Sequence, residues 1–345
     1  MAITLKDVAE AAGVSRSAVS RTFTDGASVS AKTRAKVETA ARKLGYQPSL
    51  IARSLATKRS KLVGLVANNF QNAAFLDVFD LFTSELQALE YRPLLVNLSH
   101  ETDPARSLTM LKQYSVDGVI VATSTLPPAF ASSFREAGIP VVHTFGKHHT
   151  SEKINTVGID NIECGKLAAR ALHERGYRRV GMIGGPEGAT STKDRVRGFH
   201  KQAKAMGLEI VHSLHATNYT YEAGRDAMSL MMKKAEAEAI FCGDDLICMG
   251  AMDLARAKGL AIPGDIGFLG VNGIAMSGWS AYNLTTIRQP IRDIILSSVE
   301  LIVSLMIHPE REAESRIFSC AVVERGTLRS RHSGESRDPP VSNPS

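Results

Sequence analysis

Polar side chains that can bind a ligand lie at the ends of several short β-branched runs in the second half of the chain. Asp160, Asp244 and Asn272 each come at or just after the end of such a run. In open α/β sheets, ligands bind at the carboxyl ends of the strands. We therefore expect these side chains to line a ligand-binding site. Asp160 can also cap the helix that follows it, and its two oxygens can serve both roles.

The motifs of common enzymes are incomplete wherever the chain comes near them. The glycine-rich run at 184–188 lacks the pattern of a dinucleotide-binding turn and the lysine of a P-loop. His173 and Glu174 are followed by Tyr177 where a zinc-binding H-E-x-x-H motif needs its second histidine. No G-x-S-x-G nucleophile turn occurs. The sequence thus predicts no enzyme, no metal site and no cofactor.

The cysteines and the hydropathy of the chain indicate a cellular compartment. Cys164, Cys242, Cys248 and Cys320 form no C-x-x-C pair, so we expect buried, reduced thiols rather than disulfides or metal ligands. No apolar run reaches the roughly 18 residues that would span a bilayer. The first residues lack the pattern of a secretory signal, and we expect a cytoplasmic protein.

The positive charge of the chain is concentrated at its start. Residues 1–60 contain eleven Lys or Arg and four Asp or Glu, a net charge of +7, whereas the remaining residues carry −1. A localised positive segment of this kind suits a polyanionic partner. The length of 345 residues fits a small domain followed by a larger, two-lobed one.

The start of the chain has the pattern of three short helices. Thr4 can cap a first helix, Gly13 can end it, and Ser15 can cap a second helix after a three-residue turn. Ser30 and Gly45 bound a third helix. A stripe of apolar residues on the third helix is expected to complete the core: Val37, Ala40, Ala41 and Leu44. The short connection between the first two helices predicts a helix-turn-helix.

The second of these helices carries side chains suited to base recognition. In a helix-turn-helix the second helix enters the DNA major groove. Arg16, Ser17 and Arg21 face outward on it. An arginine there can bond guanine O6 and N7 together, which discriminates against other bases by about 1–3 kcal/mol. We predict that residues 1–46 read a DNA sequence; a small helical domain with a solvated basic face explains the caps and the charge less well.

Residues 47–60 form a basic linker that contains apolar side chains. The stretch 49–56 is shorter than the roughly 12–15 residues that an isolated helix needs in water, so it should be ordered only when something supports it. Leu50, Ile51 and Leu55 can act as wedges in the minor groove. Alternatively, Ile51 and Leu55 pack against the rest of the protein. We expect a hinge helix here.

From residue 61 to 326, short β-branched runs alternate with amphipathic helical stretches. This alternation predicts doubly wound parallel α/β sheets, and the number of runs fits two lobes with a cleft better than one sheet. The strands are expected at 63–67, 93–98, 118–122, 140–144, 156–159, 180–183, 209–213, 239–242 and 266–271.

Three stretches of the first sixty residues carry a family resemblance. They read TLKDVAEAAGVSRSAVSR from Thr4, VSAKTRAKV from Val29 and LGYQPSLIARSL from Leu44. These motifs resemble the lactose-repressor/galactose-repressor family. The resemblance implies that Arg16, Ser17 and Arg21 read bases and that Leu55 opens a central base step beside its dimer mate. The other expected DNA-contacting residues are Thr4, Ser15, Ser30, Thr33 and Arg53.

The resemblance continues through the core and implies a periplasmic-binding-protein fold. The chain is then expected to cross between the lobes near 159–160 and near 286–290. Arg195 matches the family's effector-binding arginine, Tyr219 an aromatic residue that stacks on the effector, and Asp244 a polar contact at a strand end.

Three other positions leave their role open. Phe75 stands in Asn-Ala-Ala-Phe, where the family usually has Asn-Pro-aromatic-Phe, and either stacks on the effector or packs in the core. Asn272 stands where the family usually has Asp-Asp, which removes a charge from the cleft. Trp279, the only tryptophan, either lines the cleft or packs in a loop.

These residues suggest the partners of the protein. Carboxylate acceptors, one arginine and flat aromatic rings suit a sugar or sugar derivative as effector, although a nucleobase or nucleoside can use much of the same set. An enzyme on the same fold is disfavoured by the incomplete motifs, and an exported binding protein is disfavoured by the missing signal pattern and the DNA-reading residues. We expect a transcriptional repressor that binds a palindromic operator as a homodimer. Residues 327–345 are rich in Ser, Pro and Arg, so a disordered tail is expected. Because they lack leucine heptads, the C-terminal four-helix tetramerisation of some members of the family is not expected.

Overall fold

The computed structural model describes residues 3–24, 26–47, 54, 59–68, 70, 72, 74–98, 104–147, 153–233 and 236–331. The chain divides into two compact units, one of Met1–Leu62 with Ser115–Asp117 and the other of Val63–Tyr114 with Gly118–Ser345. Arg53 and Leu55, and most of the expected hinge helix, lie outside the described residues.

Among the described residues between 3 and 47 in the first unit, three helices begin and end within one residue of where the sequence predicts. They are α1 (Leu5–Ala12), α2 (Arg16–Thr22) and α3 (Ala31–Leu44). The side chains of Thr4, Ser15 and Ser30 accept hydrogen bonds from the backbone at the start of these helices. Gly13 and Gly45 end α1 and α3 with φ angles of 62° and 68°, in the left-handed region that favours glycine.

A small apolar core joins the three helices. Val8, Val19 and Val37 are fully buried in it. Arg34 of α3 donates a hydrogen bond to the Thr22 carbonyl oxygen at 2.9 Å, which links α3 to the end of α2. Leu44, the last residue of α3, is expected in the core but is instead exposed.

Asp117 joins the segment Ser115–Asp117 to the residues that follow the hinge. Its Oδ1 accepts hydrogen bonds from the Ser60 amide at 2.9 Å and from the Ser60 hydroxyl at 3.1 Å, and its Oδ2 accepts one from the Lys61 amide at 2.9 Å. Lys61 has a positive φ of 59°. The carboxylate therefore fixes the backbone where the linker ends.

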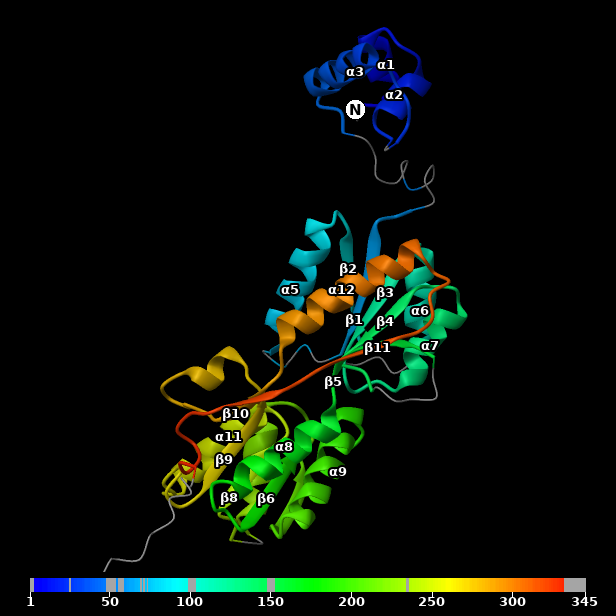
Figure 1. The fold of residues 1–345 in the computed structure, drawn as a ribbon. Coiled ribbons are helices and arrows are strands. Elements are labelled where there is room, and N and C mark those ends of the chain that lie inside the picture. Colours follow the sequence, from blue (N-terminus) through cyan, green and yellow to red (C-terminus); the bar gives the residue numbers. More distant parts are fainter. Residues whose placement is uncertain are drawn as a thin grey trace, which may run out of the picture. The chain divides into compact units, whose positions relative to one another are not determined.

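The second unit is made of two α/β lobes, and each has a six-stranded sheet (Figure 1). We call the lobe that contains β1 the N-lobe. The strand order of its sheet is β11-β5-β4-β3-β1-β2, and all pairs with a printed register are parallel. The strands are β1 (Leu62–Ala67), β2 (Arg92–Asn97), β3 (Gly118–Ala122), β4 (Val141–Thr144), β5 (Asn155–Ile159) and β11 (Ser315–Phe318). Its helices are α5 (Ala74–Ala88), α6 (Pro104–Gln113), α7 (Pro128–Glu136) and α12 (Ile291–Ile307).

The other lobe, the C-lobe, repeats this arrangement. Its strand order is β12-β10-β9-β8-β6-β7, in which only the β10–β12 pair is antiparallel. The strands are β6 (Arg179–Gly184), β7 (Glu209–His215), β8 (Ala239–Cys242), β9 (Gly267–Asn272), β10 (Thr286–Arg288) and β12 (Ala321–Val323). The helices are α8 (Asn161–His173), α9 (Thr190–Ala205), α10 (Tyr221–Met231) and α11 (Asp245–Ala257). The predicted fold class is confirmed.

The chain passes between the lobes three times. The first crossing follows β5 and leads into α8, and the second follows β10 and leads into α12. A third crossing at Ser319 and Cys320 joins β11 of the N-lobe to β12 of the C-lobe. The strands β10, β11 and β12, of three or four residues each, are not among the predicted strands.

The chain stays ordered beyond residue 326, contrary to the expected start of the tail. Thr327 and Leu328 are buried, and the Thr327 hydroxyl donates a hydrogen bond to the Phe268 carbonyl oxygen at 2.7 Å. Arg329 stacks on the Tyr177 ring at 4.5 Å. These contacts hold the segment against the C-lobe. Within the described ranges, no helix is long and apolar enough to cross a membrane.

Two pairs of glycines let the helices of the C-lobe approach each other closely. Gly165 of α8 faces the Arg195 carbonyl of α9, and Gly198 of α9 faces the Ile162 carbonyl of α8. Gly224 and Gly250 do the same between α10 and α11. The α8–α9 contact thereby fixes the helix that carries Arg195.

Gly198→Ala should destabilise the C-lobe, because the added Cβ would overlap the Ile162 carbonyl oxygen. Overpacking of this kind costs about 1–3 kcal/mol of unfolding free energy. Urea denaturation followed by circular dichroism measures the loss. Gly188→Ala is the matched control, since a Cβ at that position meets nothing within 4 Å. An equal loss in both variants would contradict the assignment.

Candidate functional site

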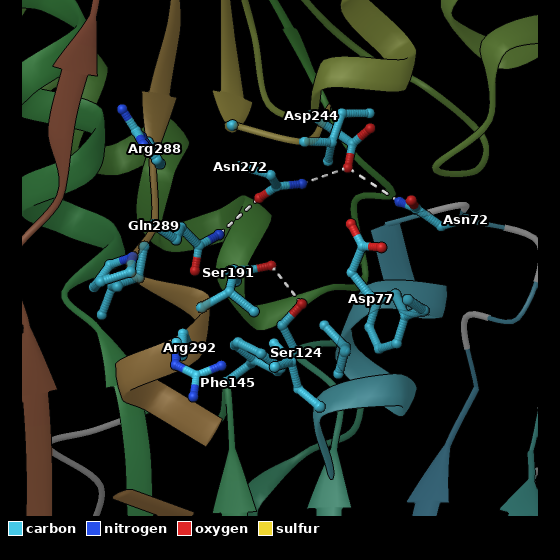
Figure 2. Close-up of a pocket in the computed structure, with 18 of the residues that line it drawn as sticks. Asn72, Asp77, Ser124, Phe145, Ser191, Asp244, Asn272, Arg288, Gln289 and Arg292 are labelled. Atoms are coloured by element: carbon cyan, nitrogen blue, oxygen red, sulfur yellow. Dashed lines mark hydrogen bonds between the residues drawn. The ribbon is translucent and has the colours of Figure 1, made fainter. Parts of the chain in front are cut away.

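A cavity of about 610 Å³ lies between the two lobes of the second unit. Its lining comes from segments that follow strands in both sheets (Figure 2). In each sheet, the strand order reverses beside the first strand, at β1 in the N-lobe and β6 in the C-lobe. Such switch points open a crevice at the carboxyl ends of the strands. Here the two crevices contribute to one cavity.

A chain of hydrogen bonds crosses the cavity from one lobe to the other. Asp244, two residues after β8, accepts hydrogen bonds on Oδ2 from the Asn72 amide at 3.1 Å and from the Asn272 amide at 2.8 Å. Asn272, at the end of β9, accepts one on Oδ1 from Gln289 at 2.7 Å. Figure 2 shows these four side chains in series. The chain connects the N-lobe, two strand ends of the C-lobe and the second crossing.

The Asp244 carboxylate is buried and also caps a helix. Its Oδ1 caps α11 by accepting hydrogen bonds from the backbone of Leu246 at 2.8 Å and of Ile247 at 3.4 Å. Burial raises the pKa of Asp244, while these hydrogen bonds, the Asn72 amide and the charge of Arg195 act in the opposite direction. The carboxylate is thus surrounded by donors on both oxygens.

Asn272 has an unusual backbone conformation at the edge of the cavity. Its φ is 116°, a region that non-glycine residues rarely adopt. Its side chain bridges Asp244 and Gln289 as donor and acceptor. An aspartate at this position could not donate to Asp244 and would place a second carboxylate beside it. The departure from the Asp-Asp of the family therefore creates a neutral bridge.

Arg195 is held in place by two hydrogen bonds. Its Nε donates to the Asn161 Oδ1 at 2.8 Å, and one terminal nitrogen donates to the Gly243 carbonyl oxygen at 2.7 Å. Asn161 starts α8 at the first crossing, and Gly243 follows β8. Arg195 as a whole is only 7% exposed, so the direction of its guanidinium group is set by these neighbours.

A second set of hydroxyl contacts joins the lobes beside Tyr219. The Tyr219 hydroxyl lies 3.1 Å from the Thr192 hydroxyl and 3.4 Å from the Ser191 hydroxyl. Ser191 donates to the Ser124 hydroxyl at 3.0 Å, and Thr190 donates to the Ser124 carbonyl oxygen at 2.8 Å. Ser124 belongs to the N-lobe, so α9 is tied to that lobe at its first turn.

The structure brings together five of the six residues predicted to bind a ligand. Phe75, Arg195, Tyr219, Asp244 and Asn272 line the cavity.

The sixth predicted residue, Asp160, does not line the cavity, although Ile159 and Asn161 on either side of it do. Its Oδ1 caps α8, accepting hydrogen bonds from the backbone of Ile162 at 2.8 Å and of Glu163 at 3.0 Å. Trp279 is also outside the lining and is 56% exposed, because it follows a short 3₁₀ turn on the surface.

Other lining residues are not singled out by the sequence analysis. They lie on α5, at the starts of helices, in loops or on the second crossing, and they meet only through tertiary packing, which no local period marks. Asn72 belongs to the motif that contains Phe75. The polar ones are Asn72, Asp77, Asp80, Ser124, Asn161, Ser191, Arg288, Gln289, Arg292 and Asp293, and the added aromatic wall is Phe145.

The three-helix unit presents a basic surface of a different kind. Arg16, Ser17 and Arg21 are exposed on α2, as predicted. The Ser15 hydroxyl lies 2.9 Å from that of Ser17. The other predicted DNA-contacting residues in the described part lie at the starts of helices; they are Thr4, Ser15, Ser30 and Thr33. Of these, Thr4 and Ser30 are exposed, and Thr33 is half-buried and accepts a hydrogen bond from the Ser30 hydroxyl at 2.8 Å.

Comparisons with known proteins cover both units. Residues 4–49 match the model of bacterial regulatory proteins, lacI family, and residues 60–320 match that of periplasmic binding proteins and sugar binding domain of LacI family. The chain belongs to the lacI family. It is a DNA-binding transcriptional repressor with an effector-binding core, and it is not an enzyme.

Individual relatives of this lacI-family chain include both curated proteins and solved structures. It is 33% identical over 293 residues to the HTH-type transcriptional repressor PurR of Pectobacterium carotovorum subsp. carotovorum (strain PC1), and the aligned region covers 83% of this chain and 85% of the relative. It is 31% identical over 331 residues to PurR of Proteus mirabilis (strain HI4320), covering 94% and 96%. The Lac repressor dimer bound to operator and the anti-inducer ONPF matches with a TM-score of 0.87 at 24% identity, covering 96% of this chain and 100% of that one.

Asp245, next to the cavity, gives a prediction about pH. Burial raises its pKa from 3.8 to about 7, although the Thr286 hydroxyl and the amides of Gly273 and Ile274 donate hydrogen bonds to it. The folded protein therefore holds this proton more tightly than the unfolded chain does. Stability that is present below pH 4 should be lost as the pH rises to about 7.

Asp245→Asn should flatten this part of the stability profile. The asparagine Oδ1 can accept from the two backbone amides while its Nδ2 donates to the Thr286 hydroxyl. Unfolding free energies from urea titrations at several pH values between 4 and 8 provide the measurement, with the exposed Asp226→Asn as control. Parallel profiles for the wild type and Asp245→Asn would rule out this origin of the pH dependence.

Proposed function

We propose that the protein represses transcription by binding a palindromic operator as a homodimer, and that a small polar effector in the cleft controls this binding. Support for the DNA part comes from α2, whose exposed N-terminal residues include Arg16 and Ser17. The second helix of a helix-turn-helix reads base edges with its N-terminal residues. The +7 charge of residues 1–60 supplies attraction to phosphates.

The predicted DNA contacts divide into two kinds. The first kind does not cap a helix, so its side chains can contact DNA without giving up a capping hydrogen bond. These residues, proposed to reach base edges, are Arg16, Ser17 and Arg21. Thr4, Ser15, Ser30 and Thr33 lie at helix starts, where the backbone amides and the positive end of the helix dipole favour a phosphate. Arg53 and Leu55 are proposed to contact the minor groove, as the family resemblance implies.

The effector is proposed to be a sugar or sugar derivative. The observation that carries this proposal is the hydrogen-bond chain of Asn72, Asp244, Asn272 and Gln289 along one cavity. It offers alternating donors and acceptors, which a ligand with several hydroxyl groups can satisfy together. Phe75 and Phe145 supply apolar faces in the same lining for the C–H side of a ring.

Two of the comparisons support the same effector class. The model that matches the core is described as a sugar binding domain. A solved structure of a transcriptional regulator CelR–cellobiose complex matches with a TM-score of 0.72 at 25% identity, covering 94% of this chain and 99% of that one. A nucleobase or nucleoside is the second candidate, because the phenylalanine rings can also stack on a flat heterocycle and the amides can pair with its edge.

Effector binding is proposed to act on the DNA-binding unit through the hinge at 47–60. The direct bonds Asn72–Asp244 and Ser191–Ser124 join the lobes across the cavity. A ligand that replaces or adds to them changes the relative stability of open and closed lobes, which is the differential binding that a switch requires. The segment 49–56 is too short to be a stable helix alone, so its order can respond to such a change.

A base-substitution series tests the DNA part of the proposal. An operator is first selected from a random duplex pool with the wild-type protein. Arg16→Ala should then discriminate less between bases at one base pair per half-site, by about 1–3 kcal/mol, because the bidentate guanine contact is removed. Lys36→Ala is the control: it should lower affinity evenly across sequences or leave it unchanged. The same base profile for Arg16→Ala and the wild type would show that Arg16 reads no base.

A thermal-shift screen of the protein against sugars, sugar acids and nucleobases tests the effector class, since a ligand of the folded state raises the melting temperature. For the compound that binds, Asp244→Asn should reduce affinity by about tenfold or more, because a hydrogen bond to a charged acceptor contributes roughly 1.5–3 kcal/mol. The asparagine Oδ1 keeps the cap on α11. Its Nδ2 then faces Asn72 and Asn272 and cannot accept a hydrogen bond from either.

Asp226→Asn, on the exposed side of α10, is the matched control and should bind as the wild type does. Calorimetry gives the affinities. Unchanged affinity in Asp244→Asn would place the effector elsewhere, and stabilisation by nucleobases alone would select the second candidate.

A further inference from the structure

The four cysteines of the chain lie in two pairs. Cys320 lies beside Cys164, and Cys242 lies beside Cys248. All four are free thiols. The second pair lies wholly inside the C-lobe, at the end of β8 and in α11. Only the first pair joins segments at different crossings.

The position of the first pair is set by the sheet of the N-lobe. Strands β5 and β11 are parallel neighbours, with Ile159 opposite Phe318 at their last paired position (Figure 1). The chain leaves β5 and enters α8, whose first turns contain Cys164. It leaves β11 through Cys320 toward β12. The first and third crossings therefore run side by side, and each carries one sulfur of the pair.

The surroundings of the two pairs differ in access and in charge. Cys164, Cys242 and Cys248 are all buried, and Cys320 alone is half-buried, so solvent reaches the first pair only from the side of Cys320. The hydrogen bond from Cys320 and the charge of Arg195 lower the pKa of Cys164, although burial opposes them. Burial raises the pKa of Cys248 well above its usual range. The thiolate is the reactive form of cysteine, so the first pair is the reactive one.

We propose that Cys164 and Cys320 are a thiol-oxidation site, which a peroxide converts to a reversible disulfide across the hinge of the cleft. This inference depends on the crossings alone and stands whether or not the effector is a sugar.

The reaction balances with hydrogen peroxide as the oxidant. The Cys164 thiolate attacks one peroxide oxygen, the O–O bond breaks, and the sulfur becomes a sulfenic acid while hydroxide leaves. The Cys320 sulfur then attacks the sulfenic sulfur, the S–O bond breaks, and the S–S bond forms. With the two thiol protons counted, two thiols and one peroxide give one disulfide and two waters. A dithiol reductant reverses the step by thiol–disulfide exchange.

The disulfide would tie the first crossing to the third. Lobe closure requires rotation of the backbone at the crossings, as hinge motions do. A covalent bond between Cys320 and the start of α8 restricts this rotation. It also forms close to Asn161, which orients Arg195 toward the cavity. Oxidation is therefore expected to stiffen the cleft rather than to block it.

Thiol counting on the full chain tests the proposal. After treatment with hydrogen peroxide and then unfolding in denaturant, two of the four cysteines should no longer react with a maleimide, the intact mass should fall by two hydrogen atoms, and dithiothreitol should restore both. Peptide mapping without reduction should join the peptides of Cys164 and Cys320. Hydrogen exchange should slow at residues 159–164 and 319–321 in the oxidised protein.

Three variants separate this pair from the other one. Cys164→Ser and Cys320→Ser should form no intramolecular disulfide, and in Cys320→Ser the sulfenic acid on Cys164 should be trapped by dimedone. Cys242→Ser should still lose two thiols. Four reactive thiols after oxidation, a bond mapped to Cys242 and Cys248, or a bond between two chains would overturn the proposal. Mapping on the wild type decides the matter even if a variant fails to fold.

Discussion

The Asp244 carboxylate is the interaction on which the ligand-binding part of the molecule depends. A buried charge is costly unless donors surround it, and here two backbone amides of α11 and two side-chain amides do so. One of those side chains belongs to the other lobe. The same group thus starts a helix, orients Asn272 and holds the lobes together. Any polar ligand that enters the cavity must compete with, or add to, these hydrogen bonds.

The rest of the core places this carboxylate correctly. Because the two sheets have the same strand order, their switch points contribute to one cavity from opposite sides. The glycine contacts between α8 and α9 bring Arg195 near Asn161, and those between α10 and α11 fix the helix that Asp244 caps. Side chains in the cavity are therefore held by neighbours in regular elements rather than by loops alone, which is the preorganisation that specific binding requires.

Local patterns predict most of this arrangement, and long-range contacts explain what they miss. The helix caps of the head and the other nine strands follow from spacing and residue type. The short strands β10 to β12 and the contacts of Asn72 and Gln289 arise only when distant segments meet. Asp160 looks like a ligand-binding residue because it follows a strand, but the helix after it already uses its carboxylate. Thr327 and Leu328 lie in a polar segment that the C-lobe nevertheless buries.

The third crossing has a consequence for how the chain is made. Neither lobe is a continuous stretch: the N-lobe needs α12 and β11, and the C-lobe needs β12, all from the last part of the described chain. During synthesis, the face of the N-lobe that α12 covers stays exposed to solvent until the whole C-lobe has left the ribosome. Leu301 and Ile302 of α12, both fully buried, are among the residues that finally cover it. Completion of the two lobes is therefore a single late event in biosynthesis, and a premature stop before the final strands would leave both incomplete.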